Sequence, residues 1–321
     1  MQFSRRRLAI SYLCALLPVI AVTAQAQQRT LPSDYRVICE RECLVGFADR
    51  FLTALVNRNP SLVPMGPQVR YTENGTALAL GDALWATASA LGDNKLIFTD
   101  PATGGIVIYA TLLENGLPSM LSARLKVQNR QITEIETSVL RRNEGDSSME
   151  TFALQRPIWF EEVPDGQRVS RQALIDIADS YFEGITQGRG DITPFHDECI
   201  RFENGGQMTS RTDDNAGEIQ RMGCQQQFHT GMLVIVTSAS NRRYPVVDED
   251  NQIVFAVTTF DHQGTVDTVP MRTGGTYTAS GLFRRPFSFL ILESFKIIDG
   301  KIRQVEATVL RVPYRMHPGW Q

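Results

Sequence analysis

The sequence lacks an excess of charge of either sign. Its 32 lysine and arginine residues stand against 35 aspartate and glutamate residues, which leaves a net charge of -3. A protein that binds nucleic acid or an anionic membrane electrostatically needs a basic face, so this balance argues against both partners. Hydrophobic residues make up 42% of the chain, which is enough to build packed cores and argues against a disordered protein.

Common cofactor and nucleophile motifs are also absent. The sequence has no phosphate-binding P-loop, no glycine-rich dinucleotide motif and no serine nucleophile elbow, which removes the common nucleotide-dependent and acyl-transfer classes. His196, Asp197 and Glu198 are adjacent, and three adjacent side chains cannot all face one ion. We therefore expect neither a cofactor nor a metal.

The first 26 residues are typical of an export signal. Arg5, Arg6 and Arg7 precede an apolar stretch over residues 8–24, and Ala24-Gln25-Ala26 fits a small-x-small cleavage site. The stretch is too short for a membrane span, and either the general secretory or the twin-arginine route fits it. No later segment reaches 18 apolar residues, so we expect a periplasmic or extracellular protein that does not enter the membrane.

Cysteine is scarce, and four of the five cysteines follow the expected signal. An even number in an exported chain favours disulfides over metal thiolates. Three pairings of Cys39, Cys43, Cys199 and Cys224 are possible, and we expect the most local one, Cys39–Cys43 with Cys199–Cys224. A zinc site is the alternative, but two distant pairs without CxxC spacing argue against it.

The remainder of the chain is a tandem duplication. Residues 125–142 and 295–312 align without gaps, and three earlier blocks recur in the same order. Identical pairs in the aligned segment are Lys126/Lys296, Ile132/Ile302, Glu136/Glu306, Val139/Val309, Leu140/Leu310 and Arg141/Arg311. The earlier blocks pair Ala48-Asp49 with Ala178-Asp179, 70–75 with 201–205, and 106–116 with 254–264. We therefore divide the chain into a first domain (27–142), a linker (143–168) and a second domain (169–321).

Both copies show the same order of expected elements. Each opens with an amphipathic helix, at roughly 42–57 and 170–187, and Ser170 is placed to cap the second one. A short strand ending in Glu-Asn-Gly follows, then a short helix such as 82–91, and finally a meander of alternating strands. This order predicts an α+β fold with a helical group on one side of an antiparallel sheet.

The last strand of each copy has two unlike faces. Alternation places Ile135 and Val139 on an apolar face, and Glu136 on a mixed face together with Ile132. The second copy repeats this pattern with Ile302 and Glu306. A mixed face is typical of a sheet that meets another sheet or lines a polar cavity, and we expect each glutamate to pair with a cation across strands. Trp159 and Trp320, both near prolines, are interpreted as hydrophobic plugs, with ligand binding as the alternative.

The motif before each final strand, FKIIDGKIRQ at 295–304 and LKVQNRQITE at 125–134, resembles the nuclear transport factor 2-like superfamily, particularly its SnoaL-like branch. Arg130 replaces the usual turn glycine in the first copy. The resemblance implies two cone-shaped domains, each a helical group on a curved antiparallel sheet with a pocket between them, packed as a pseudo-dimer. The chain would then be a monomer or a dimer. Members include cofactor-free isomerases, dehydratases, cyclases and hydrolases, and also non-catalytic binding modules, so the fold does not settle the activity.

The two copies differ in ways that indicate where a site would lie. The second copy carries insertions in the regions 206–227 and 265–288, and the latter, rich in glycine and threonine, could form a lid over a pocket. His196, His229 and His262 lie in the second copy, and the first copy contains no histidine. Histidine suits proton transfer near neutral pH, so we expect any active site within 190–290.

Five side chains there are candidates. Asp261 could be a base with a raised pKa, or a turn residue at the Gly264 hairpin; His262 points to the opposite face of the same strand. His229 could enter a pocket or be structural. Arg243 and Tyr244 could hold a substrate oxyanion or carboxylate, or lie at a solvated edge.

We therefore expect an exported, cofactor-independent lyase, isomerase or hydrolase that acts on a small, largely apolar molecule. His229, Asp261 and His262 would transfer protons, and Arg243 and Tyr244 would orient the substrate. The alternatives are a small-molecule binding protein that uses the same pocket without turnover, and a structural module whose cavity is filled by its own side chains. The enzyme hypothesis requires these residues to converge on one hollow.

Overall fold

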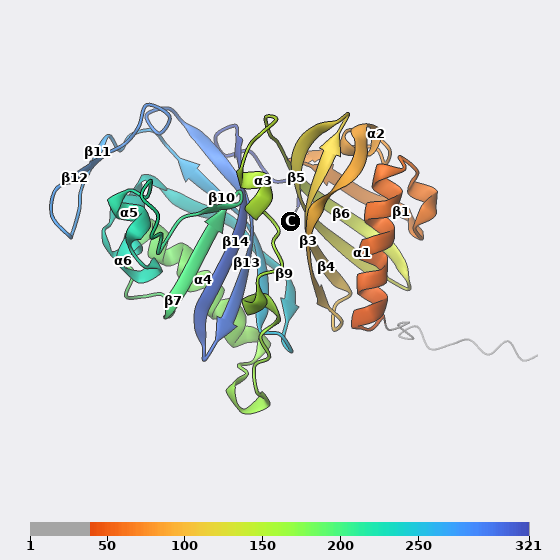
Figure 1. The fold of residues 1–321 in the computed structure, drawn as a ribbon, viewed down its shortest axis with the longest axis horizontal. Helices are drawn as coiled ribbons and strands as arrows, with labels where there is room; N and C mark the ends of the chain where they lie inside the picture. Colours follow the sequence, from red (N-terminus) through yellow and green to blue (C-terminus); the bar gives the residue numbers. More distant parts are fainter. Residues whose placement is uncertain (1–38, 321) are drawn as a thin grey trace, which may run out of the picture. The chain divides into compact units, whose positions relative to one another are not determined.

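Two six-stranded mixed sheets and few helices make up the α+β fold of the computed structural model, which describes residues 39–320 (Figure 1). The expected export signal at 1–26 lies outside the described residues. Cys39–Cys43 and Cys199–Cys224 form the two disulfides, which confirms the local pairing. No helix in the described part of the chain is long and apolar enough to cross a membrane.

The strands of the two sheets follow the same order. The first sheet runs β2-β1-β6-β5-β4-β3 and the second runs β8-β7-β14-β13-β10-β9, so the orders correspond strand by strand. The first sheet comprises β1 (Met65–Glu73), β2 (Thr76–Ala77), β3 (Ala88–Asp100), β4 (Gly105–Glu114), β5 (Leu117–Gln128) and β6 (Gln131–Arg141). The second comprises β7 (Phe195–Glu203), β8 (Gly206–Gln207), β9 (Ser238–Asp248), β10 (Ile253–His262), β13 (Phe287–Ile298) and β14 (Lys301–Val312). The same strand order in both sheets is what a duplicated sequence predicts.

Each sheet contains one parallel pair, so the prediction of purely antiparallel sheets is wrong in this detail. β1 runs parallel to β6, with Tyr71 opposite Ile135, and β7 runs parallel to β14, with Arg201 opposite Val305. Both β1 and β7 follow a helical segment, and each lies far in sequence from the strand with which it pairs. No tight hairpin therefore imposes an antiparallel direction on these pairs.

One long helix packs against each sheet. α1 (Arg41–Val56) and α4 (Arg171–Gln187) agree with the predicted ranges, and the hydroxyl of Ser170 accepts a hydrogen bond from the backbone of Ala173. The short helix expected at 82–91 is only α2 (Leu84–Thr87), because the chain from Ala88 onward joins β3. The other helical segments are η1 (Pro60–Leu62), α3 (Ser148–Thr151), η2 (Pro157–Phe160), η3 (Asp165–Gln167), α5 (Glu218–Arg221), α6 (Cys224–His229) and η4 (Met232–Ile235).

Each helix shares a hydrophobic core with its own sheet. Phe47 and Phe51 of α1 pack with Ile135, and Phe182 of α4 packs with Phe295. Ile132 and Ile302 also belong to these cores, although strict alternation places them on the mixed face. The reason is an irregularity in the pairing of β6 with β5 and of β14 with β13, which shifts the alternation near the start of each last strand.

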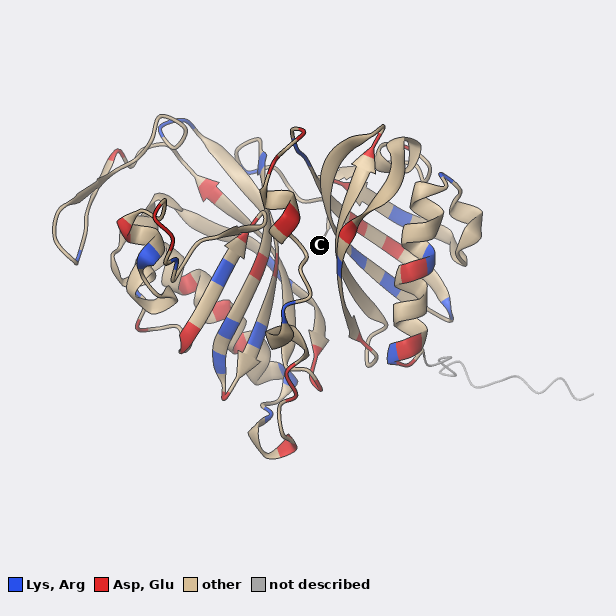
Figure 2. Cartoon of the chain, in the orientation of Figure 1, with Lys and Arg blue, Asp and Glu red and all other residues tan. Residues whose placement is uncertain are grey.

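The mixed faces of the two sheets meet each other. All described residues belong to one compact unit, and a third core joins Phe98 and Tyr109 of the first sheet to Phe255 of the second. Glu136 pairs with Arg124 of the neighbouring strand and with Arg243 of the other sheet. Glu306 pairs with Arg156 of the linker instead of a neighbouring strand (2.7 Å). Figure 2 shows basic and acidic residues on the strands of both sheets.

The linker and the C-terminal tail are fixed by their tryptophans. Trp159 on η2 is buried and packs against Phe98, with ring centroids 4.9 Å apart. Trp320 is buried between the guanidinium groups of Arg70 and Arg124, and its indole donates a hydrogen bond to the hydroxyl of Thr72 (2.8 Å). Both tryptophans therefore fill space inside the protein, as the interpretation as hydrophobic plugs requires.

Candidate functional site

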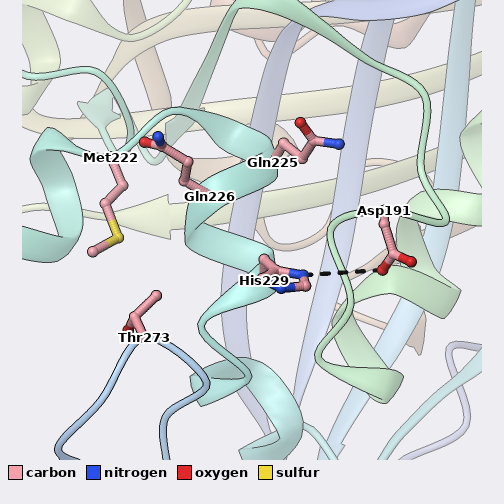
Figure 3. A pocket seen from close by; sticks show the side chains of 6 residues that line it. All are labelled: Asp191, Met222, Gln225, Gln226, His229 and Thr273. Carbon is pink, nitrogen blue, oxygen red and sulfur yellow. Dashed lines mark ion pairs between the residues drawn. The ribbon is translucent and has the colours of Figure 1, made fainter.

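A hollow of about 470 Å³ lies in the second copy, where the two insertions approach each other (Figure 3). The first insertion contributes Met222 and α6, and the second contributes Thr273. The complete lining is Asp191, Met222, Gln225, Gln226, His229 and Thr273. Figure 3 shows Met222 and Thr273 on one side of His229 and Asp191 on the other. The insertions that distinguish the second copy from the first therefore form part of the wall of a cavity.

Helix α6 supplies half of this lining and is anchored at both ends. Its first residue, Cys224, is disulfide-bonded to Cys199 on β7. The side chain of Gln226 accepts a hydrogen bond from the backbone of Gly223, just before the helix. Gly231 adopts a left-handed conformation (φ 81°) that glycine tolerates, and the helix cannot continue through it. These constraints hold a helix of six residues that would not be stable alone.

His229 and Asp191 form a pair at the edge of the hollow. Nδ1 of His229 lies 4.0 Å from a carboxylate oxygen of Asp191, and their side chains are 53% and 49% exposed. Hydrogen bonds from the guanidinium of Arg189 lower the pKa of Asp191 to about 2. The carboxylate therefore stays ionised at any physiological pH.

The second insertion reaches the hollow as an extended arm, residues 265–285. Two short strands, β11 (Thr268–Pro270) and β12 (Thr276–Thr278), form its stem. At its tip, the backbone of Arg272 donates to the carbonyl of Thr230 (3.0 Å) and its side chain donates to the carbonyl of Gly188 (3.3 Å). These contacts dock the tip beside His229, as the lid hypothesis requires.

Asp261 lies away from this hollow. Its carboxylate is buried and accepts hydrogen bonds from the hydroxyls of Ser238, Ser240 and Ser288, at 2.7, 3.1 and 2.6 Å. Three hydroxyl donors therefore occupy this carboxylate inside the protein. It also lies within β10 instead of at the Gly264 turn, so neither sequence interpretation describes its surroundings.

His262 is also buried, on the opposite face of β10. Its ring stacks on Phe287 at a centroid distance of 4.5 Å and an interplanar angle of 7°. Burial lowers the pKa of His262 to about 4, so the imidazole is neutral at physiological pH. Its surroundings are those of an aromatic core residue.

Arg243 and Tyr244 point to two further places. Arg243 crosses to Glu136 of the first sheet. Tyr244 donates its hydroxyl to Asp179 on α4 and lines a separate hollow along that helix. Of the five predicted site residues, only His229 therefore lines the hollow made by the insertions, and the five do not converge.

Sequence reasoning missed a set of polar residues inside the second copy, which we call the interior cluster: Tyr181, Arg201, Glu203, Gln227 and Glu293. All are buried except Glu203, whose side chain is 30% exposed. The cluster lies between α4, α6 and the second sheet. The hydroxyl of Tyr181 donates to Glu293 (3.0 Å) and accepts from Arg201 (2.8 Å). Arg201 also donates to Glu203 (2.5 Å) and to the side-chain carbonyl of Gln227. The space between helix and sheet therefore contains charged groups.

In the described part of the first copy, the equivalent positions do not form this cluster; a smaller buried pair lies there, in which the hydroxyl of Tyr71 donates to Glu73 (3.1 Å). Strand pairing makes Arg201 equivalent to Tyr71, because these residues lie opposite the equivalent Val305 and Ile135. The same comparison makes Glu293 equivalent to Ala123, since they lie opposite Ala307 and Thr137. The sequence alignment instead paired Arg201 with Arg70, which hid the difference. A glutamate aligned with an alanine in a buried strand was the available signal.

Burial gives the protein an unusual dependence of stability on pH. Desolvation raises the pKa of Glu293 to about 8 and that of Glu306 to about 7. Both folded-state values exceed those of the unfolded chain, so the folded state holds extra protons between about pH 4.5 and 8. We therefore expect the free energy of unfolding to fall from pH 5.5 to pH 8, by on the order of 3 kcal/mol.

Urea denaturation at both pH values measures this change. Glu293→Gln should remove part of the fall. A free energy of unfolding that rises over this range would contradict the assignment of neutral buried acids.

The second copy also carries the match to known proteins. Residues 167–309 match a family described as a domain of unknown function, DUF8021. No curated protein matches the chain. In residues 39–320, no three histidine, cysteine, aspartate or glutamate side chains lie close enough together to hold a metal ion.

Proposed function

We propose that the protein binds a small molecule in the hollow of the second copy. The observation that carries this proposal is that both insertions contribute to the same cavity, beside His229. A volume of about 470 Å³ is within the range of small-molecule sites. Binding is favoured over the catalytic hypothesis because Asp261, His262, Arg243 and Tyr244 have other partners.

The lining indicates the chemistry of the ligand. The thioether of Met222 and the methylenes of Gln225 and Gln226 offer apolar contact, while their amides donate and accept hydrogen bonds. Arg189 compensates the charge of Asp191, so the rim does not present an isolated charge. The best-fitting ligand is a small uncharged molecule with an apolar body and one hydrogen-bonding edge.

A second candidate function rests on the pair of His229 and Asp191. A carboxylate beside an imidazole can orient the ring for proton transfer. His229 would then be the general acid or base of a cofactor-independent lyase, isomerase or hydrolase. Turnover of a bound compound that is lost in His229→Asn, while binding persists, would favour this activity over binding alone.

We further propose the cellular setting and the fold family. Two disulfides are consistent with an oxidising compartment and hence with export to the periplasm or beyond the cell. Helix-backed curved sheets that contact each other support an internal pseudo-dimer of nuclear transport factor 2-like domains.

The test is a screen of small aromatic and aliphatic compounds by ligand-observed NMR, followed by titration of the best binder. His229→Ala should weaken binding at least tenfold, which is about 1.4 kcal/mol, because the imidazole borders the cavity. His196→Ala is the matched control, since His196 does not line the hollow, and it should leave the affinity unchanged. Equal effects of the two substitutions would contradict the proposed site.

A further inference from the structure

Helix α6 separates the hollow from the interior cluster. Gln225, Gln226 and His229 face the hollow, whereas Phe228 packs in the core and Gln227 reaches Arg201. The helix has six residues and therefore forms a thin partition. A change in the cluster beneath it can alter the lining above it.

Gln227 connects the cluster to the first insertion. Its side-chain carbonyl accepts a hydrogen bond from Arg201, and its amide donates to the carbonyls of Met208 (2.8 Å) and Ile219 (3.1 Å). Met208 and Ile219 both lie in the inserted region. Arg201 therefore holds the insertion in place through one neutral side chain.

Arg201 is also the cation for two carboxyl groups. It contacts Glu203 directly and Glu293 through the hydroxyl of Tyr181. One carboxyl oxygen of Glu293, Oε2, is buried and has no hydrogen-bond partner among the described residues. A neutral carboxylic acid tolerates such surroundings, but a carboxylate needs donors or a cation.

The titratable and charged groups around Glu293 come from the helices and strands that lie next to β13. Tyr181 approaches from α4, and Arg201 and Glu203 approach from β7. Gln227 of α6 is neutral. Tyr109 of β4 lies on the other side of the sheet, where its hydroxyl is bonded to Ser294. Among the described residues, Arg201 is therefore the cation whose charge acts on Glu293.

We propose that Glu293 and Arg201 form a proton-controlled latch on α6: loss of the proton from Glu293 draws Arg201 away from Gln227 and loosens the helix that lines the hollow. The regulation of ligand binding by this latch rests on the proposed function; the loosening of α6 does not.

Loss of the proton from Glu293 should loosen α6, and not tighten it, because several acceptors compete for the guanidinium of Arg201. When Glu293 is neutral, the charge of Arg201 is balanced by Glu203 at Nη2, and Nη1 donates to Gln227. When Glu293 is ionised, two carboxylates compete for Arg201, and the neutral amide is the weaker acceptor. Burial raises the pKa of Glu293 to about 8, so the change falls at mildly alkaline pH.

Hydrogen exchange of the full-length exported chain without ligand tests the latch. After correction for intrinsic exchange rates, the opening constant of residues 224–231 should rise by up to about tenfold per pH unit as the pH approaches 8 and should level off above it, because opening releases the proton of Glu293 only while the closed state still holds it. Helix α1 of the first copy, which lacks the cluster, should change only as much as global unfolding does, which urea denaturation at the same pH values measures. Glu293→Gln should abolish the pH dependence in α6.

Glu306→Gln is the matched control. Glu306 is also buried with a raised pKa, but it contacts Arg156 and not α6, so the pH dependence of α6 should persist in this variant. A pH-independent α6, an equal rise in α1, or persistence of the rise in Glu293→Gln would overturn the latch. If Glu293→Gln does not fold, the comparison of α6 with α1 in the unchanged protein still decides. A failed ligand screen would refute the proposed function and leave this result intact.

Discussion

Replacing Arg201 by methionine is expected to lower the free energy of unfolding by about 3–5 kcal/mol. The guanidinium is buried and contacts Tyr181, Glu203 and Gln227. Its removal leaves buried acceptors without a donor and a buried acid without its cation. The loss should be larger at pH 8.5 than at pH 6, because Glu293 is then ionised.

Chemical denaturation of Arg201→Met and of the double variant Arg201→Met/Glu293→Met measures this effect. The double variant should recover at least half of the lost stability, because apolar groups of similar volume replace a buried charged pair well. It also approaches the first copy, where Tyr71 and Ala123 occupy these positions. A double variant less stable than Arg201→Met would show that the cluster does not act as a coupled unit.

Replacing Trp159 by alanine should lower the free energy of unfolding by about 3–5 kcal/mol through the cavity it leaves. The indole is buried in the core between the two sheets and packs against Phe98. The linker would then lose its main apolar anchor. Thermal and urea denaturation measure the change.

The neighbouring Phe160 provides the control. It lies on the same turn but is 57% exposed, so Phe160→Ala should change stability by less than about 0.5 kcal/mol. Similar losses in both variants would contradict the view that the buried ring of Trp159 anchors this turn of the linker.

The main features of the fold could be predicted from local patterns. The apolar stripe with Ser170 as a cap predicted α4 closely, and the repeated blocks predicted two sheets with equal strand order. The even number of cysteines and their spacing predicted both disulfides. The parallel pairs of β1 and β7 were missed because no turn signal reports the partner of a strand that follows a helix.

The site was predicted only in part. Histidine content and the insertions indicated the region where the hollow lies and His229, but residue type does not reveal partners. Asp261 could not be placed among three serines, nor Arg243 opposite Glu136 of the other copy, because both depend on three-dimensional contacts. Glu293 was overlooked because a charged residue in an apolar strand is a weak signal until its equivalent, Ala123, is known.

Backbone NMR shift mapping with a small-molecule binder tests most directly whether the insertions of the second copy create a binding site. The account predicts that shifts concentrate at residues 222–229, Asp191 and Thr273, around the hollow. The first copy has a smaller hollow of about 250 Å³ near Glu114 and Arg141, which serves as an internal comparison. Shifts that concentrate there instead, or that spread equally over both copies, would contradict the account.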